Sequence, residues 1–459
     1  MKRRLLSAFL AVMMVLTMAP VAFAADTETT TEYVAQVDGT NYETLADAIE
    51  AANNKTLTLL KDVNGQIVIP EGKTVTLDLN GNTVTAPSGR YDAVINQGTL
   101  TVTDSQKTGE IISNGNGGIG ISAGSDTTIE YAKVTGREGA IGGDKSTVGA
   151  KLTINDGVFT GVDNAVVIFN GSKRDGDANK ITINGGIFNG KIQSPGYIAC
   201  GIYAPWKDDI TVNNGTFNIE NGAGIVARGG MVTVKGGEFN TTGNITGMVG
   251  DYKGTVPCSA LVFDSTAGYP GMNDDSQIVV EDGKFKSDVA AVTVIKQTSD
   301  AGNRVKVTGG TFSSDVSAYV GEGYVQNNGT VEQLGETNAV AEVGGTYYKT
   351  LAEAVSAADN NTVTLLKNTV EDVVIPADKT ITLDLNGKKI VNSTTAQDSK
   401  VANDARKHTI TNNGTLTIMD SVGGGVVDNV SHQRAALYNN GTITEIKGGK
   451  FTRSVDNST

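Results

Sequence analysis

Cysteine, histidine, tryptophan and proline are scarce in this chain of 459 residues, which has 2 Cys, 2 His, 1 Trp and 8 Pro. Two cysteines cannot build a disulfide framework, and a chain of this length can bury a core without one. Both histidines, His408 and His432, lie near the C-terminus. A mechanism that needs a histidine between residues 25 and 400 is therefore excluded.

Long apolar runs are also absent, except at the N-terminus. There Lys2, Arg3 and Arg4 precede an apolar stretch from Leu5 to Met18, and Ala22-Phe23-Ala24 follows with the small residues of a signal-peptidase site. This order is typical of a secretory signal peptide over residues 1–24. The alternative is an uncleaved anchor, but the stretch is short for a membrane span. We expect a secreted, extracellular protein without membrane insertion.

Positive charge is the third scarcity. The sequence has 37 Lys and Arg against 50 Asp and Glu, a net charge of −13, and removal of the three N-terminal cations gives −13 − 3 = −16. An acidic surface repels nucleic-acid phosphates and anionic lipid. We therefore expect no nucleic-acid partner, whereas neutral glycans and proteins remain possible partners.

Glycine and β-branched residues are abundant instead, and they recur in a short unit. The unit is a strand of alternating apolar residues, a turn containing Gly, and a Phe. The copies that end at successive phenylalanines are Leu152–Phe159, Ile181–Phe188, Ile210–Phe217, Val232–Phe239, Ile278–Phe285 and Val305–Phe312. A longer copy is Ile443–Phe451. A fixed repeat of strands indicates a repeat architecture.

The unit predicts parallel stacking of its strands. Alternating apolar residues turn one face of each strand inward, and glycine can turn the corner that follows. A further apolar run precedes each unit and amphipathic helices are absent between coils, so equivalent strands should pair in parallel about 4.8 Å apart. We predict an all-β fold, a right-handed parallel β-helix, with an internal ladder of Phe159, Phe188 and Phe217. The asparagines Asn155, Asn184 and Asn213 should stack likewise; the alternative is a row of antiparallel sandwiches.

One spacing in this series is unusual. The phenylalanines follow one another after 29, 29, 22, 46 and 27 residues. The spacing of 46 is about two of the shorter steps, so we expect one further coil around Asp251.

A second, longer repeat duplicates a module. Residues 34–81 align without gaps on residues 340–387, at an offset of 306. Helical spacing of Leu45 and Ile49 predicts a short capping helix over about 41–53. An Asn-Asn-Gly turn predicts a closing hairpin over about 323–333. The expected organisation is a linker (25–33), a first module (34–335), a linker (336–339) and a second, apparently truncated module (340–459).

These motifs resemble a known family. The capping helix, the Thr-Leu-Asp-Leu-Asn-Gly strand, the segment from Asn96 to Val102 and the Gly-Gly-x-Phe coils are similar to pectate-lyase-like adhesive domains, which have the pectin-lyase fold, in surface proteins of gut-type Gram-positive bacteria. The resemblance implies adhesion or display at the cell surface, with a host or microbial glycan or protein as partner. It specifies architecture rather than activity.

β-Helices also include enzymes, so an enzyme is the alternative. Lyases acting on uronates need acidic residues that hold Ca²⁺ and a base, whereas hydrolases need a carboxylate pair. Acidic residues that precede the strands of successive units are the candidate metal ligands, with Arg174, Lys207, Arg228 and Arg304 as nearby bases: Asp175, Asp177, Asp208, Asp209, Asp274 and Asp275. The competing interpretation is a solvated acidic edge, with no catalytic residue and no cofactor.

The candidate binding residues are aromatic. Trp206 lies beside Pro205 and charged residues, which indicates an exposed loop, although a Trp covering the edge of a coil is the alternative. Tyr197, Tyr203 and Tyr269 would extend such a patch.

The two cysteines, Cys200 and Cys258, should lie two coils apart. Two coil steps are roughly 9.6 Å, beyond disulfide reach. We expect buried free thiols.

Three functions therefore remain open. The favoured one is a non-catalytic adhesin that binds through loops at the coil edges. The others are a calcium-dependent polysaccharide lyase or another carbohydrate-active enzyme, and a spacer without any site.

Overall fold

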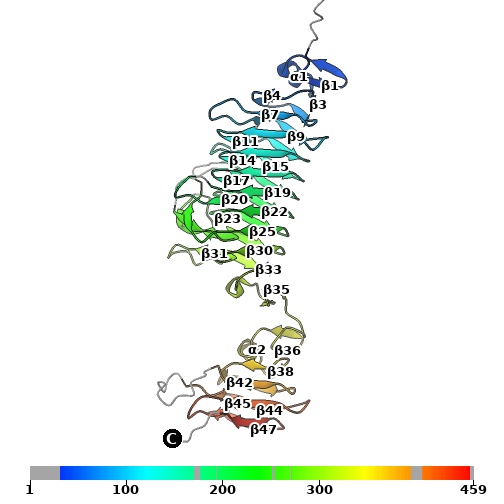
Figure 1. The fold of residues 1–459 in the computed structure, drawn as a ribbon. Coiled ribbons are helices and arrows are strands. Elements are labelled where there is room, and N and C mark those ends of the chain that lie inside the picture. The colour runs from blue at the N-terminus through cyan, green and yellow to red at the C-terminus, as the bar shows by residue number, and fades with distance from the viewer. Residues whose placement is uncertain are drawn as a thin grey trace, which may run out of the picture.

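The computed structural model describes residues 32–169, 176–192, 194–250, 254–269, 271–393 and 406–454, and the expected signal peptide lies outside them. Within this part of the chain strands dominate, and they form long, mostly parallel sheets (Figure 1). No helix among the described residues has the length and apolar character that crossing a bilayer requires.

The first module consists of three long sheets, which we call sheets A, B and C. Sheet A contains β2 (Thr40–Tyr42), β1 (Ala35–Val37), β3 (Lys55–Leu59), β6 (Thr74–Asp78), β9 (Thr99–Thr103), β12 (Asp126–Ile129), β15 (Lys151–Ile154), β18 (Lys180–Ile183), β21 (Asp209–Val212), β24 (Met231–Val234), β29 (Gln277–Val280) and β32 (Val305–Val307). Sheet B contains β4 (Val63–Asn64), β7 (Thr83–Thr85), β10 (Glu110–Ser113), β13 (Lys133–Gly136), β16 (Val158–Gly161), β19 (Ile187–Gly190), β22 (Thr216–Ile219), β25 (Glu238–Thr241), β30 (Lys284–Ser287), β33 (Gly310–Phe312), β35 (Thr330–Gln333) and β34 (Tyr324–Asn327). Sheet C contains β5 (Ile67–Ile69), β8 (Val94–Asn96), β11 (Gly117–Ile121), β14 (Gly139–Gly143), β17 (Ala165–Phe169), β20 (Ala199–Ala204), β23 (Gly222–Ala227), β28 (Leu261–Asp264) and β31 (Val292–Ile295).

Each coil supplies one strand to each sheet, as β15, β16 and β17 do, and the next coil repeats the order. Strands of neighbouring coils pair in parallel, for example Leu152 with Ile181 and Ile181 with Ile210. The prediction of parallel stacking is confirmed, and the arrangement is consistent with a parallel β-helix. The antiparallel sandwich is excluded for these strands.

The predicted side-chain ladders are present inside and outside the stack. Six phenylalanine rings form one buried column, with ring centroids 4.4–5.2 Å apart: Phe159, Phe188, Phe217, Phe239, Phe285 and Phe312. On the surface, the Asn213 amide donates to Asn184 at 2.7 Å and the Asn184 amide donates to Asn155 at 2.8 Å. Each ladder follows from the register, which places equivalent residues above one another.

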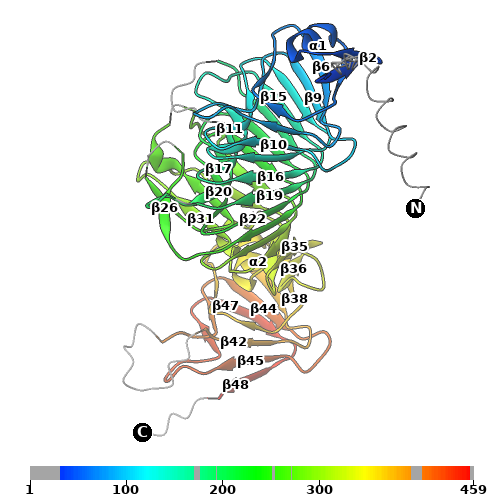
Figure 2. The same cartoon turned by 45° about the horizontal axis from the view of Figure 1, so that its top comes forward.

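The additional coil that we expected around Asp251 is wrong. Phe239 and Phe285 are direct partners in register on β25 and β30, so no coil lies between them. The chain between these strands instead contains an antiparallel pair, β26 (Thr246–Met248) and β27 (Thr255–Pro257). We call this pair the hairpin; Figure 2 shows β26 at the side of the stack, near β31.

Both ends of the first module carry the expected elements. Helix α1 (Leu45–Ala51) begins at Thr44, whose hydroxyl accepts a hydrogen bond from the Asp47 N–H, and its buried Ala48 and Ile49 belong to the core of the stack. At the other end β34 and β35 pair across a two-residue turn. Two short 3₁₀ helices, η1 (Ser265–Ala267) and η2 (Ser317–Tyr319), lie in connections.

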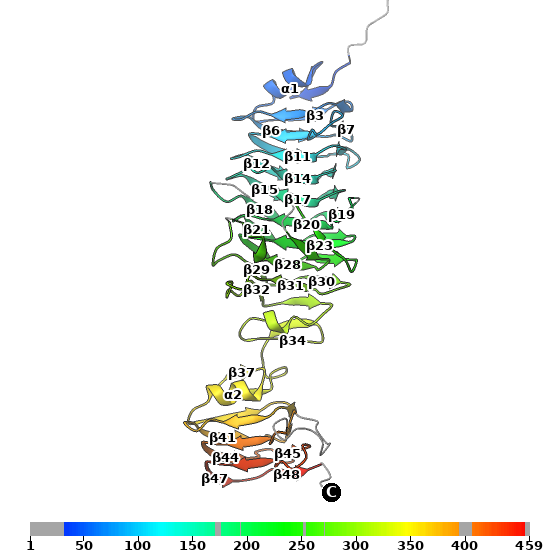
Figure 3. The ribbon, with the colours of Figure 1, turned by 90° about the vertical axis from the view of Figure 1, so that its left-hand side faces the viewer.

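The second module repeats the beginning of the first around a separate hydrophobic core (Figure 3). Helix α2 (Leu351–Ala357) and the first strands recur at the predicted offset of 306. The strands are β36 (Ala341–Val343), β37 (Thr346–Tyr348), β38 (Asn361–Leu365), β39 (Thr369–Val370), β40 (Val373–Ile375), β41 (Thr380–Asp384), β42 (Lys389–Val391), β43 (Ile410–Asn412), β44 (Thr415–Met419), β45 (Val426–Asn429), β46 (Leu437–Asn439), β47 (Thr442–Ile446) and β48 (Lys450–Arg453).

The cysteines are free and buried, as expected. Cys200 lies in β20, while Cys258 directly follows β27 of the hairpin. Burial raises the pKa of the Cys200 thiol to about 12 and also raises the pKa of Cys258.

Candidate functional site

The aromatic residues that the sequence singled out do not form an exposed patch. Tyr203, Trp206 and Tyr269 are 1%, 5% and 3% exposed, and Tyr197 is partly buried. Their expected exposure is therefore wrong for three of the four. The hairpin covers part of this group, because Gly250 lies against the Tyr203 ring and Met248 bridges to Tyr197. The Tyr269 hydroxyl lies 3.2 Å from the Tyr203 hydroxyl. The Trp that covers a coil edge is the better description of Trp206.

The aspartate row lies along one edge of sheet A, but it does not form a site among the described residues. Asp177, Asp209, Asp274 and Asp275 are exposed, whereas Asp208 is buried and accepts the Asn179 N–H at 3.0 Å. Asp175 lies outside the described residues. Strand β24, whose first residue is Met231, separates the coil of Asp209 from the coil of Asp274 and Asp275. In the described part of the chain, no three acidic, His or Cys side chains come together as metal ligands.

Two of the candidate bases are held in ion pairs. Arg228 is fully buried and its Nε donates to Asp264 at 3.0 Å. Arg304 donates to both oxygens of Asp300 at 3.0–3.1 Å. Lys207 is exposed, and Arg174 lies outside the described residues. Asp208, Arg228 and Arg304 are therefore engaged in hydrogen bonds within the fold.

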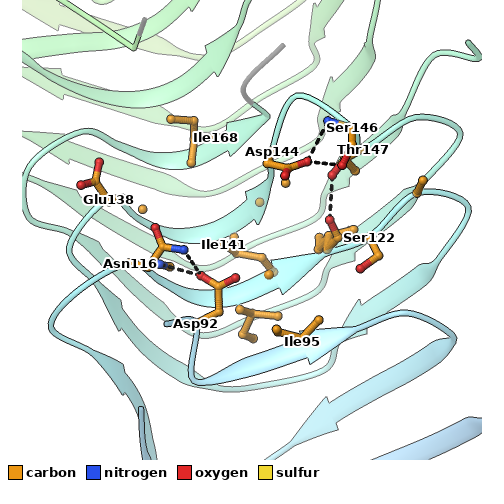
Figure 4. A pocket seen from close by; sticks show the side chains of 18 of the residues that line it. Asp92, Ile95, Asn116, Ser122, Glu138, Ile141, Asp144, Ser146, Thr147 and Ile168 are labelled. Atoms are coloured by element: carbon orange, nitrogen blue, oxygen red, sulfur yellow. Dashed lines mark hydrogen bonds between the residues drawn. The ribbon is translucent and has the colours of Figure 1, made fainter. Parts of the chain in front are cut away.

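A different face carries a groove. It runs along the outer surface of sheet C across β8, β11, β14 and β17 and encloses about 440 Å³ (Figure 4). Its floor includes Gly120 and Gly142, which are in register. A Cβ at Gly120 would lie 2.3 Å from Asp92 Oδ2, and one at Gly142 would lie 1.7 Å from the Ile168 carbonyl oxygen. The floor is low because no side chains can rise from these two positions.

Polar residues form the two walls. One wall is a row of polar residues that lie one or two positions before a strand of sheet C: Asp92, Asn116, Glu138 and Asn164. The other wall follows the strands and includes Gln97, Ser122, Asp144, Ser146 and Thr147. Because the strands are parallel, residues at equivalent positions of successive coils meet at one edge of the sheet. In Figure 4 Asp92 and Asn116 face Asp144 across Ile141.

Asp92 is the titratable group of the groove whose pKa is shifted. Its Oδ1 accepts the Gly117 N–H at 2.8 Å and the Asn116 amide at 2.9 Å. Burial raises the pKa of Asp92, the two hydrogen bonds oppose this rise, and the negative charge of Asp144 adds to it. Both hydrogen bonds end on Oδ1, so Oδ2, which lies over Gly120, has no partner among the described residues.

The other charged groups of the groove are more exposed. Asp144 Oδ1 accepts both the N–H and the hydroxyl of Ser146, at 2.7 and 2.5 Å. Arg90 donates to Glu138 at 3.1 Å, and 79% of the Arg90 side chain is exposed. The groove therefore offers carboxylates, amides, hydroxyls and one guanidinium, which are the donors and acceptors that pair with hydroxyl-rich ligands.

The residues of this groove were not predicted from the sequence. The predicted metal ligands precede the strands of sheet A, whereas the polar row of the groove precedes the strands of sheet C. Asp92, Asn116, Glu138 and Asn164 are separated by 24, 22 and 26 residues, close to the coil length. That periodicity is the signal that could have found them.

Comparisons with known proteins gave no match: no protein-family model, no curated protein and no solved structure matches this chain.

Proposed function

We propose that this chain is an extracellular, adhesin-like protein that binds a glycan, without turnover, in the groove of sheet C. One observation carries the proposal: carboxylate, amide and hydroxyl groups converge over a floor of glycines. Hydrogen bonds to several hydroxyl groups of one sugar need polar atoms fixed on both sides of a shallow trough. A surface that is acidic overall favours a neutral glycan over a polyanion.

The finer description of the fold belongs to the same proposal. We propose a right-handed coil, because connections between parallel strands of one sheet are almost always right-handed. Helix α1 and the β34–β35 hairpin act as its two caps, since they cover open sheet ends that would otherwise pair with other chains. We also propose that the N-terminal signal peptide exports the chain. The same proposal places the chain among the pectate-lyase-like adhesive domains. Display on the cell surface would then present the groove to a host or microbial glycan.

The test is binding of the full exported chain to a glycan array, followed by titration of the best polysaccharide. We expect Asp92→Asn to weaken binding about 10–100-fold, because a hydrogen bond to a charged group contributes about 1.5–3 kcal/mol. Asp275→Asn is the matched control, since it removes an exposed carboxylate at sheet A. Equal loss with both variants, or no binding to any glycan, would remove the proposal.

A second candidate function is hydrolysis of the glycan. The observation that favours it is the raised pKa of Asp92 beside the charge of Asp144. Glycoside hydrolases use one protonated carboxyl group as acid and one carboxylate as base or nucleophile. Asp92 would protonate the glycosidic oxygen as the bond to the sugar carbon breaks, and Asp144 would take a proton from the attacking water.

Measurement of new reducing ends separates the two candidates. Hydrolysis predicts that they accumulate in the presence of the wild-type chain and stop accumulating with Asp92→Asn and with Asp144→Asn. Binding without any release of reducing ends rejects hydrolysis and leaves the adhesin. A calcium-dependent lyase would instead produce unsaturated uronates, which absorb in the ultraviolet, and would lose activity with a chelator.

A further inference from the structure

On the outer face of sheet C, the residues that line the groove are followed about halfway along the stack by buried residues. One row of outward residues runs in register through Ile95, Gly120, Gly142 and Ile168, all of which line the groove. The next residue of the same row is Tyr203, which is 1% exposed. The floor of the groove therefore ends between β17 and β20.

The wall ends at the same place. The polar row of Asp92, Asn116, Glu138 and Asn164 does not continue in the next coil. Ala165 pairs with Cys200, so the position of Asn164 is taken there by Ala199, which is 0% exposed. Asn164 is the last polar member, and its Oδ1 accepts the N–H of Gly250 at 3.2 Å. Gly250 follows β26, so the hairpin touches the groove through this hydrogen bond.

The hairpin is fixed in this position. Its Val249 and Val256 belong to a small buried cluster on the outer face of sheet C, together with Tyr203 and Val226. Arg228, paired with Asp264 beneath it, donates to the Val249 and Gly254 carbonyl oxygens at 3.3 and 3.5 Å. A buried ion pair that also bonds the backbone makes this element a wall and not a mobile flap.

Gly250 is the point of closest approach. Its φ is +70°, and a Cβ there would lie 2.3 Å from Cε1 of Tyr203. Any other residue would clash with the ring and would also be strained at this φ. The fit of the hairpin on the sheet therefore depends on glycine at this position.

We infer that the hairpin closes one end of the groove, so that the groove accepts the terminus of a glycan chain and not an internal stretch. This inference rests on the proposed glycan binding. The outward row stays partly exposed at the other side, where Ile95 adjoins Val68 of β5. A chain can leave the groove there, whereas at β20 its path meets Gly250 and Tyr203.

The experiment compares short and long fractions of the best-binding polysaccharide, prepared by partial hydrolysis and titrated into the full chain. Recognition of an end predicts an affinity per mole of chains that is independent of chain length. Recognition of internal stretches predicts an affinity per mole that rises with chain length. That second result overturns the inference and leaves the proposed function intact, whereas no binding of any fraction removes the proposed function itself.

A variant of the hairpin tests whether the hairpin is the reason that affinity does not depend on chain length. Gly250→Val should displace the hairpin and make the affinity per mole rise with chain length, while Thr255→Ala, an exposed position of the same hairpin, should leave the length-independence unchanged. Circular dichroism and the midpoint of urea unfolding check that the variant folds. If Gly250→Val folds, binds and still shows no dependence on length, the hairpin does not close the groove and the inference is wrong.

Discussion

At the scale of single residues, the phenylalanine column packs equivalent rings of successive coils against one another. Phe217 is fully buried and its ring lies 4.4 Å from the Phe188 ring and 4.5 Å from the Phe239 ring. We expect Phe217→Ala to lower the free energy of unfolding by about 3–5 kcal/mol, because it leaves a cavity in a continuous column. Urea unfolding measures the loss. Asn218→Ala, the exposed neighbour in β22, should cost less than about 1.5 kcal/mol.

A second prediction at this scale concerns acid stability. The hydrogen bonds from Arg304 lower the pKa of Asp300 to about 2. A carboxyl group whose pKa is lower in the folded state stabilises the fold above its unfolded pKa, and this stabilisation disappears as pH falls through the folded value. Asp300→Asn should therefore destabilise the protein at pH 6, and the difference from wild type should shrink as pH falls from about 4 to about 2. Unfolding midpoints over this range, with Asp275→Asn as the exposed control, decide the prediction.

The inward residues of the coils could be predicted from the sequence, whereas for the groove the sequence carries only the coil-length spacing of the polar row and no signal for the contacts of its residues. Alternation in Ile181-Thr182-Ile183 fixes which side chains face inward, because the strand period is two. Neither the burial of Asp92 nor its contact with Gly117 has a local signal, since both depend on the next coil. Likewise, the local sequence around Trp206 indicated exposure, whereas its side chain is buried in the fold.

At the scale of elements, the hairpin is the feature that periodicity misreads. Phe239 and Phe285 are 46 residues apart, about two of the shorter steps, so counting residues between them suggested an additional coil. The strands β26 and β27 carry too few inward apolar residues for a coil. The buried side chains of Val249, which follows β26, and of Val256 in β27 pack outside sheet C instead. Length alone cannot distinguish a coil from an insertion; the pattern of apolar residues can.

The anchoring of the hairpin leads to a third prediction. Arg228 and Asp264 have side chains that are 0% and 1% exposed, so removing one partner leaves an uncompensated buried charge. We expect Arg228→Ala to destabilise the first module by about 3–5 kcal/mol. It should also increase protease cleavage in the hairpin, because Arg228 otherwise donates hydrogen bonds to the Val249 and Gly254 carbonyl oxygens. Lys235→Ala, an exposed basic residue, should change neither the urea midpoint nor the cleavage pattern.

At the scale of the whole molecule, the chain consists of two stacks built by one rule. The gapless repeat at an offset of 306 predicted that the strands and the helix at the start of the first module would recur in the second, and they do. The positions of Asp92 and Gly120 lie beyond the aligned segment, so the repeat predicts the strands and the helix of the second module and makes no prediction about a groove there.

The separate cores lead to the last prediction. The buried residues of the first stack form one continuous cluster, and those of the second stack form another, smaller one. Because cooperative unfolding follows a shared core, we expect two thermal transitions in calorimetry of the full chain. The second module buries less apolar surface and should unfold at the lower temperature. A fragment of residues 32–335 should keep the upper transition unchanged, while a single transition in the full chain that shifts on truncation would mean that the two stacks unfold as one unit.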